Sequence, residues 1–152
     1  MTNKINRKLL FLCTGNYYRS RFSEHLFNAL AQEKELNWQA DSRGLAIERG
    51  INNIQVISPY ADRGLRRRGL RVPINERFPC QAINEDFETA YKIIALDECE
   101  HRPLIETRFS KWINEVEYWE IHDIDRTFPT IAMEQMERRI SKLIQVLEMI
   151  EY

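Results

Sequence analysis

Residues 8–20 read KLLFLCTGNYYRS, a continuous apolar run followed by a short polar loop. The run has the length of a strand, and its lack of polar alternation predicts a strand buried on both faces. Gly15 and Asn16 then interrupt it, and a helical pattern of apolar residues begins near Ser20. A loop of this kind favours anion binding, because backbone N–H groups at the helix N-terminus point toward it.

Outward from this stretch, strand and helix patterns alternate along the chain. Strands are expected at about 38–42, 91–96 and 116–121, and helices at about 20–36, 58–69 and 130–150, with a helical turn at 84–87 and a helix after residue 97. This order predicts an α/β fold, with three α/β/α layers, a four-stranded and mainly parallel sheet, and a phosphate-binding loop after the first strand. No linker or repeat interrupts the pattern, so we expect residues 1–152 to form a single domain.

The carboxyl ends of parallel strands meet at one edge of such a sheet, and ligands bind at that edge. Residues 14–20, 42–45, 97–99 and 121–125 all follow predicted strands. We therefore expect these four segments to lie along one rim of the molecule.

The composition excludes several functional classes. The 152 residues carry 22 basic and 23 acidic side chains, so no general attraction to nucleic acid or to an anionic membrane is expected. No apolar run approaches the length that spans a bilayer, and no signal peptide is evident. Three cysteines do not make a disulfide scaffold, and no residue cluster has metal-ligand spacing. We expect a cytoplasmic protein with reduced thiols and no metal or other cofactor; its oligomeric state is not predicted.

Three residue types in the loop point to nucleophilic chemistry on phosphate. Cys13 ends the predicted strand, and both a helix N-terminus and a nearby arginine stabilise a reactive thiolate. Arg19 is suited to hold two phosphate oxygens, and Ser20 to donate a hydrogen bond to the thiolate. The alternative interpretation is a small apolar residue at a strand end, a surface arginine and a serine that caps the helix.

The loop resembles the signature of the low molecular weight protein tyrosine phosphatase family, which has an apolar strand, then Cys, any residue, Gly, Asn, two residues, Arg, Ser and usually Pro. Residues 37–42 (NWQADS) and 86–98 (DFETAYKIIALDE) are similar to two further segments of that family, in the same order. The resemblance implies hydrolysis of phosphomonoesters, above all protein phosphotyrosine, through a phosphocysteine intermediate on Cys13. It implies a phosphorylated protein or a small phosphomonoester as substrate, and no cofactor.

The resemblance also implies roles for neighbouring residues. The loop residues implied to bind substrate are Thr14, Gly15, Asn16, Tyr17, Tyr18 and Ser20. Tyr17 is expected to face the substrate ring, and Tyr18 to pack beneath the loop. Ser42 is expected to hydrogen-bond Asn16, and Asp97 to orient loop elements at the same rim. Serine and aspartate are also ordinary turn-forming residues at strand ends.

Cleavage of a phosphomonoester by a thiolate also needs a general acid for the leaving oxygen, and then a base for water. The family supplies both with an aspartate in an Asp-Pro pair, which this chain lacks. Asp123 matches that aspartate by its position after the last predicted strand, and Asp125 is the competing candidate. Either aspartate is equally suited to cap the loop before residues 127–129. His122 is expected to support the site rather than to transfer protons.

Two departures from the family pattern carry expectations of their own. Tyr18 stands where the family often has a second cysteine, so a protective disulfide with Cys13 is not expected. Arg21 replaces the usual proline, which predicts either an extra cation at the loop mouth or a solvated side chain in the first turn of the helix.

Two other functions stay open at this point, and one motif is unassigned. Arsenate reduction on the same fold needs two further cysteines close together, but Cys80 and Cys99 are 19 residues apart. A pseudophosphatase that binds phosphate without turnover is the second alternative, because the Asp-Pro pair is missing. Arg63, Arg67 and Arg71 share one row if their helix continues, either as a solvated face or as a docking patch for an acidic phosphoprotein.

Overall fold

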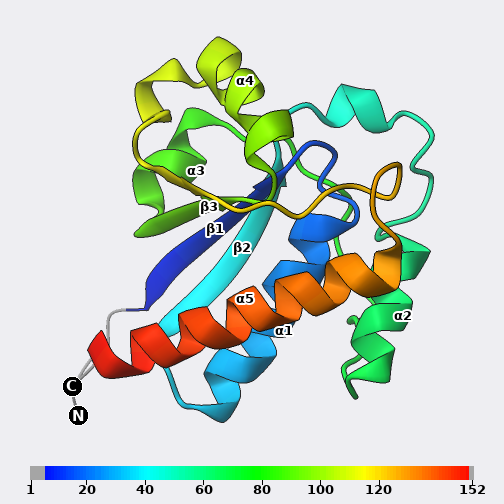
Figure 1. Cartoon of the computed structure of the whole chain (residues 1–152), viewed down its shortest axis with the longest axis vertical. Coiled ribbons are helices and arrows are strands. Elements are labelled where there is room, and N and C mark those ends of the chain that lie inside the picture. Colours follow the sequence, from blue (N-terminus) through cyan, green and yellow to red (C-terminus); the bar gives the residue numbers. More distant parts are fainter. Residues whose placement is uncertain (1–5, 151–152) are drawn as a thin grey trace.

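The computed structural model describes residues 6–150, which form a four-stranded sheet with helices against both faces (Figure 1). The strands are β1 (Arg7–Cys13), β2 (Trp38–Gly44), β3 (Lys92–Ala95) and β4 (Val116–Tyr118), and the α-helices are α1 (Arg19–Glu33), α2 (Pro59–Arg67), α3 (Asn84–Thr89), α4 (Glu98–Arg108) and α5 (Pro129–Ile150). The order across the sheet is β2-β1-β3-β4, and every neighbouring pair is parallel. The predicted α/β fold with a parallel sheet is confirmed.

β1 is a central strand, as its uninterrupted apolar sequence predicts. It pairs with β2 on one side and β3 on the other, and residues 9–13 are buried. Successive side chains point to opposite faces of a strand. Leu9 and Phe11 accordingly belong to the core cluster shared with α1, α2 and α5, whereas Leu10 and Leu12 belong to a second cluster shared with α3 and α4.

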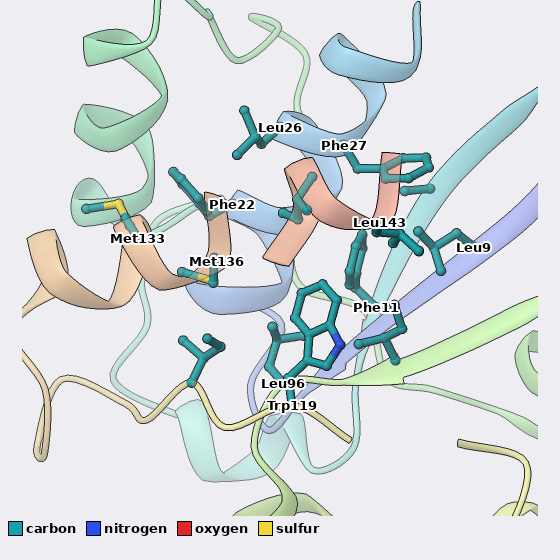
Figure 2. Close-up of a cluster of buried hydrophobic side chains, with 14 of the residues drawn as sticks. Leu9, Phe11, Phe22, Leu26, Phe27, Leu96, Trp119, Met133, Met136 and Leu143 are labelled. Atoms are coloured by element: carbon teal, nitrogen blue, oxygen red, sulfur yellow. The ribbon is translucent and has the colours of Figure 1, made fainter. Parts of the chain in front are cut away.

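The larger core cluster fills the layer between the sheet and the helices α1, α2 and α5 (Figure 2). α5 contributes an apolar stripe at three- and four-residue spacing that includes Met136 and Leu143. Phe11 of β1 makes edge-to-face contacts with Phe27 of α1 at 6.2 Å and with Trp119 at 5.9 Å. This packing fixes α1 against β1, and therefore fixes the ends of the loop that joins them.

α2 begins at the predicted signal but ends before the arginine run does. The Ser58 side chain accepts a hydrogen bond from the Tyr60 backbone N–H at 3.2 Å, which caps the helix. The helix ends at Arg67, and Gly69 turns the chain with a φ of +77°. Arg71 therefore lies outside the helix, and the row of three arginines is reduced to the two within it.

The carboxyl-terminal edge of the sheet extends beyond the last strand. β4 ends at Tyr118, but the Trp119 N–H donates to the Ala95 carbonyl at 2.9 Å and the Ile121 N–H to the Leu96 carbonyl at 2.7 Å. The chain after β4 thus stays beside β3 until it reaches the end of β1. Within residues 6–150, every helix is too short or too polar to cross a membrane.

Candidate active site

The loop between β1 and α1 contains a strained residue whose side chain holds it in place. Asn16 lies in the left-handed region with a φ of +52°, which asparagine tolerates better than most residues. Its side-chain nitrogen donates to the Ser20 and Ser42 Oγ atoms, each at 2.9 Å. Its side-chain oxygen accepts from Arg77 Nη1 at 2.8 Å and from the Cys80 N–H at 3.0 Å. The expected hydrogen bond between Asn16 and Ser42 is therefore present.

β2 approaches the loop closely because the strand ends in a glycine. A Cβ atom on Gly44 would lie 2.9 Å from the Thr14 carbonyl oxygen and 3.1 Å from the Asn16 backbone nitrogen. The first distance is shorter than real Cβ contacts and the second is tight, so a larger residue would displace the loop from β2. The sequence indicates that Gly44 ends a strand, but only the fold shows that this residue must lie close to the loop backbone.

Cys13, Ser20 and Arg19 meet where β1 passes into α1. Cys13 is the last residue of β1, and its side chain is buried. Its Sγ atom lies 2.9 Å from the Ser20 Oγ atom, within hydrogen-bond distance for sulfur. Arg19 is the first residue of α1 and lines the same pocket as Cys13. The loop thus gathers a thiol, a hydroxyl and a guanidinium at a helix N-terminus.

Arg19 is only 2% exposed and is held by backbone and acidic partners. Its Nη1 donates to the Ile121 carbonyl at 2.8 Å and its Nη2 to Glu100 Oε2 at 2.7 Å, while its buried Nε has no partner within residues 6–150. Burial lowers the pKa of the Arg19 guanidinium, but the charges of Cys13, Glu100 and Asp123 outweigh burial and raise it. The side chain therefore stays charged.

Three carboxylates surround this guanidinium. Besides Glu100, Asp123 Oδ2 lies 3.6 Å from Arg19 Nη2 and Asp97 Oδ2 lies 3.7 Å from Arg19 Nη1. Asp97 is buried, whereas Asp123 is partly open to solvent. The fold therefore brings the segments after β1, β3 and β4 to one rim, and within residues 6–150 no group of acidic, histidine and cysteine side chains is placed to hold a metal ion.

Glu100 is a site residue that the sequence interpretation does not identify. Its carboxylate accepts hydrogen bonds from Arg19, from the Thr14 hydroxyl and from His101 Nε2 at 3.1 Å. His101 Nδ1 accepts from the Asp97 N–H at 3.0 Å, which leaves Nε2 to donate to Glu100. Burial raises the pKa of the Glu100 carboxyl, but the bond to His101 and the charge of Arg19 hold it well below its usual range. Its one sequence signal is its position, one residue beyond the predicted rim.

The structure separates the two candidate acids. Asp123 lines the pocket together with Cys13. Asp125 is exposed and lies outside the residues that line this pocket. His122 places its Nδ1 2.8 Å from Asp97 Oδ2, so its ring contacts a buried carboxylate next to Arg19.

The pocket beside Cys13 has a volume of about 200 Å³ and aromatic walls. Tyr17, Tyr18 and Tyr60 line it, and the rings of Tyr18 and Tyr60 meet edge to face at 6.4 Å. Tyr18 forms part of the pocket wall, and it is also buried and belongs to the larger core cluster. Its hydroxyl is buried without a partner in the described chain, and burial together with Asp123 raises the pKa of Tyr18 to about 12.

Arg21 corrects a sequence-based expectation, because it is neither a cation at the loop mouth nor a solvated side chain. It is fully buried behind the loop. Its Nη1 donates to the Val56 carbonyl at 2.8 Å, its Nη2 donates to the Arg77 carbonyl at 2.7 Å, and Glu76 forms an ion pair at 3.3 Å. The segments on either side of α2 thus meet at the first turn of α1, where the Val56 carbonyl from one segment, and the Arg77 carbonyl and the Glu76 carboxylate from the other, replace water around the guanidinium.

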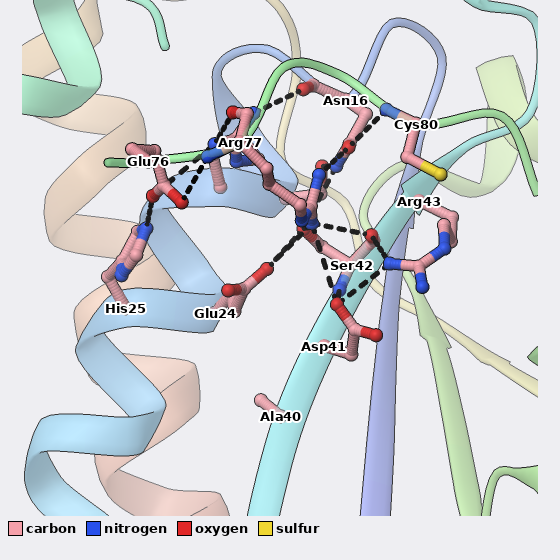
Figure 3. Close-up of polar contacts among 12 residues, drawn as sticks. Asn16, Glu24, His25, Ala40, Asp41, Ser42, Arg43, Glu76, Arg77 and Cys80 are labelled. Carbon is pink, nitrogen blue, oxygen red and sulfur yellow. Dashed lines mark hydrogen bonds and ion pairs between the residues drawn. The ribbon is translucent and has the colours of Figure 1, made fainter. Parts of the chain in front are cut away.

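Arg77 connects this buried network to the loop (Figure 3). Its Nη2 donates to the Ser42 carbonyl at 2.8 Å and pairs with Glu24 at 3.1 Å, in addition to the bond from its Nη1 to Asn16. The contacts with Ser42 and Asn16 join residues 35 and 61 positions apart in the chain. Local sequence patterns carry no signal for contacts of this range.

The remaining two cysteines lie on different parts of the molecule. Cys80 is half-buried behind the loop, where its N–H bonds Asn16, and Cys99 is exposed in the first turn of α4. All three cysteines of the chain are within the described residues and are unpaired.

Comparison with known proteins shows the family from sequence and the same fold from structure. The sequence profile of the low molecular weight phosphotyrosine protein phosphatases matches residues 8–150. The low molecular weight phosphotyrosine protein phosphatase of Sus scrofa is 30% identical over 106 residues, which cover 68% of this chain and 63% of that protein. The Homo sapiens protein is 28% identical over 109 residues, with the same coverage. The match thus spans less than two thirds of these relatives.

Solved structures show the same fold at lower identity. The low molecular weight protein tyrosine phosphatase from T. tengcongensis superimposes with a TM-score of 0.75 at 20% identity, covering 91% of this chain and 98% of that one. YfkJ from Bacillus subtilis gives 0.77 at 20% identity, with 96% and 97% covered. The YwlE arginine phosphatase from Geobacillus stearothermophilus gives 0.75 at 20% identity, with 95% of both chains covered. With a family profile that matches nearly its whole length, this chain belongs to the low molecular weight phosphotyrosine protein phosphatase family.

Proposed function

We propose that this protein hydrolyses phosphomonoesters, with phosphotyrosine of proteins as its substrate, through a phosphocysteine intermediate on Cys13. One observation carries the proposal: the buried Cys13 thiol lies 2.9 Å from Ser20 Oγ at the N-terminus of α1, in one pocket with Arg19 and Asp123. A helix N-terminus and a charged guanidinium both stabilise a thiolate and a phosphate group.

In the first step, Arg19 and the backbone N–H groups of the loop hold the phosphoryl oxygens. The Cys13 thiolate attacks phosphorus, a sulfur–phosphorus bond forms, and the bond to the leaving oxygen breaks. Asp123, protonated at this stage, gives its proton to that oxygen. In the transition state the negative charge is spread over the three equatorial oxygens, and the fixed donors around these oxygens lower the barrier.

In the second step, the phosphoryl group passes from sulfur to water. Asp123, now a carboxylate, takes a proton from the water molecule that attacks phosphorus. The sulfur–phosphorus bond breaks, inorganic phosphate is released, and Cys13 returns as a thiolate. The Ser20 hydroxyl, already within hydrogen-bond distance, stabilises the departing thiolate.

The surrounding residues position these groups. We assign to Asn16, with Ser42, the task of keeping the loop in its strained conformation. Glu100 and Asp97 hold Arg19 in its orientation, and each is fixed in turn by a histidine. Thr14 and Gly15 contribute loop backbone to phosphate binding.

Two tyrosines of the loop contact the rest of the substrate. Tyr17 and Tyr18 line the pocket, and aromatic walls suit an aryl phosphate. Burial raises the pKa of Tyr18 to about 12, so its hydroxyl stays protonated. We place the protein in the cytoplasm, because catalysis by Cys13 needs a reduced thiol.

The test is hydrolysis of an aryl phosphate by the wild-type protein with a metal chelator present. We expect turnover, and we expect Cys13→Ala to abolish it while the circular dichroism spectrum stays that of the wild type. Turnover that survives in Cys13→Ala would reject the thiolate mechanism. An inactive wild type that still binds inorganic phosphate would indicate a phosphate-binding protein instead.

A further inference from the structure

The arginines of α2 have no part in the chemistry proposed above. Arg66 and Arg68 are paired with carboxylates, at 3.4 and 3.1 Å. Arg63 and Arg67 are exposed, and neither has a carboxylate partner in the described part of the chain. Residues four apart in a helix lie on the same face, so the two unpaired cations stand side by side.

These two cations border a groove between α2 and the start of α5, which lie next to each other in Figure 1. Gly64 and Met133 also line the groove, and a Cβ on Gly64 would collide with the Met133 sulfur. Phe128, in the segment that leads into α5, lines the groove and is 75% exposed. The groove therefore combines an apolar lining with two cations along one side.

The groove and the pocket that contains Cys13 are neighbours that share one lining residue, Tyr60, which is 41% exposed. The Arg63 guanidinium lies over the Tyr60 ring, 5.2 Å from its centre. When the phosphorylated residue of a peptide occupies the pocket, the neighbouring segment of the peptide therefore passes Tyr60 and then Arg63.

We propose that this groove binds the segment next to the phosphorylated residue of a protein substrate, and that this segment carries an apolar side chain and two carboxylates. The proposal rests on the function proposed above. Arg63 and Arg67 are about 6 Å apart along the helix axis, which matches alternate residues of an extended peptide. Glu134 and Glu137 line the next depression beyond Arg67, so the positive stretch is short.

The test compares binding of labelled phosphotyrosine peptides to the full-length Cys13→Ala protein by fluorescence anisotropy. Two acidic peptides are compared. One has an isoleucine and two alternate aspartates after the phosphotyrosine, and the other has them before it. Each has a neutral counterpart with asparagine in place of both aspartates. We expect one acidic peptide to bind about tenfold tighter than its asparagine counterpart at low salt, and this advantage to shrink at high salt. Equal affinity of acidic and neutral peptides in both orientations would overturn the proposal.

A matched pair of variants separates the groove from general charge attraction. Arg63→Gln with Arg67→Gln should remove the preference for the acidic peptide, whereas Arg66→Gln with Arg71→Gln, which removes the same charge outside the groove, should keep it. Equal loss in both double variants would contradict the groove. An aryl phosphate that wild type fails to hydrolyse would defeat the proposed function separately, because peptide binding is measured without turnover.

Discussion

Two arginines in the first turn of α1, two residues apart, stand on opposite sides of the same loop. Arg19 lines the pocket, with Glu100, Asp97 and Asp123 around it. Arg21 lies behind the loop, where its partners are mostly backbone carbonyls. Both are almost fully buried, so burial does not distinguish them.

The two guanidinium groups differ in whether their surroundings leave access for a substrate. The carboxylates around Arg19 are at a rim that is partly open to solvent, where an anionic substrate can join them. The carbonyls around Arg21 belong to Asn16, Val56 and Arg77, so this guanidinium ties the loop to two distant segments. In the proposed mechanism, one side of the loop therefore serves binding and chemistry, and we infer that the other side serves stability.

Arg19→Lys is the sharpest test of the pocket side. Lysine keeps the charge but lacks the planar fork that holds two phosphate oxygens. We expect kcat/KM for an aryl phosphate to fall about 10³-fold, and the free energy of unfolding to fall by no more than about 2 kcal/mol, because lysine keeps the charge beside the carboxylates but not all of the hydrogen bonds. Steady-state kinetics measures the change in kcat/KM, and urea denaturation measures the change in the free energy of unfolding. A large loss of stability with little loss of activity would reverse the roles assigned to the two arginines.

Substitution of Asp123 or Asp125 tests the next largest effect, which is on kcat. Asp123→Asn should lower kcat by about 10²-fold, because the leaving oxygen loses its proton donor and water loses its base. Asp125→Asn should change kcat by less than about twofold, since that side chain is exposed and outside the pocket. Steady-state assays of both variants decide the matter. The opposite ranking would assign the proton transfer to Asp125.

Behind the loop the expected effect is on stability. Arg21→Met should lower the free energy of unfolding by about 3 kcal/mol, because the Val56 and Arg77 carbonyls would lose their buried donor and Glu76 would keep only His25 and the Arg77 N–H as partners. At temperatures where the variant is folded, kcat should stay within about tenfold of wild type. Denaturation with kinetics on the same sample tests both. In the Arg21→Met background, Glu76→Gln should cost less stability than it does in the wild type, and independence of the two changes would exclude the ion pair.

The smallest effect is a pH dependence of the same network. Burial raises the pKa of Glu76, but His25, Arg21 and the Arg77 N–H lower it below its ordinary value. A carboxyl with a lowered folded-state pKa stabilises the protein above its unfolded pKa of about 4.3, and this contribution is lost as pH falls through the folded value. Glu76→Gln should therefore cost about 1–2 kcal/mol at neutral pH and progressively less below about pH 4. A cost that stays constant with pH would show that its ionisation is not linked to folding.

The pocket side could be predicted from sequence further than the back of the loop could. Cys13, Arg19 and Ser20 lie within eight residues, and the strand, loop and helix that hold them follow from local apolar patterns. Asp97 and Asp123 reach the site because parallel strands end at one edge, which the element order predicts. Glu100 was not identified from the sequence, because this residue lies one position beyond the expected rim segment, in the first turn of a helix.

The back of the loop depends on contacts that no local pattern encodes. Arg21 meets Arg77 across 56 residues of chain. Its burial becomes favourable only when the segments before and after α2 supply the Val56 and Arg77 carbonyls together with Glu76. A family signature with proline at this position gives no indication of that arrangement. Arg71, by contrast, leaves the row on α2 for a local reason, because the helix ends at Arg67 and Gly69 turns the chain.

The central claim is that Cys13 carries the phosphoryl group between substrate and water. The most direct measurement is acid quenching of the protein during turnover of an aryl phosphate, followed by proteolysis and mass spectrometry. We predict one phosphoryl group on the peptide that contains Cys13 in the wild type, and none on this peptide in Cys13→Ala. A phosphoryl group on another residue, or turnover with no covalent adduct at Cys13, would contradict the mechanism.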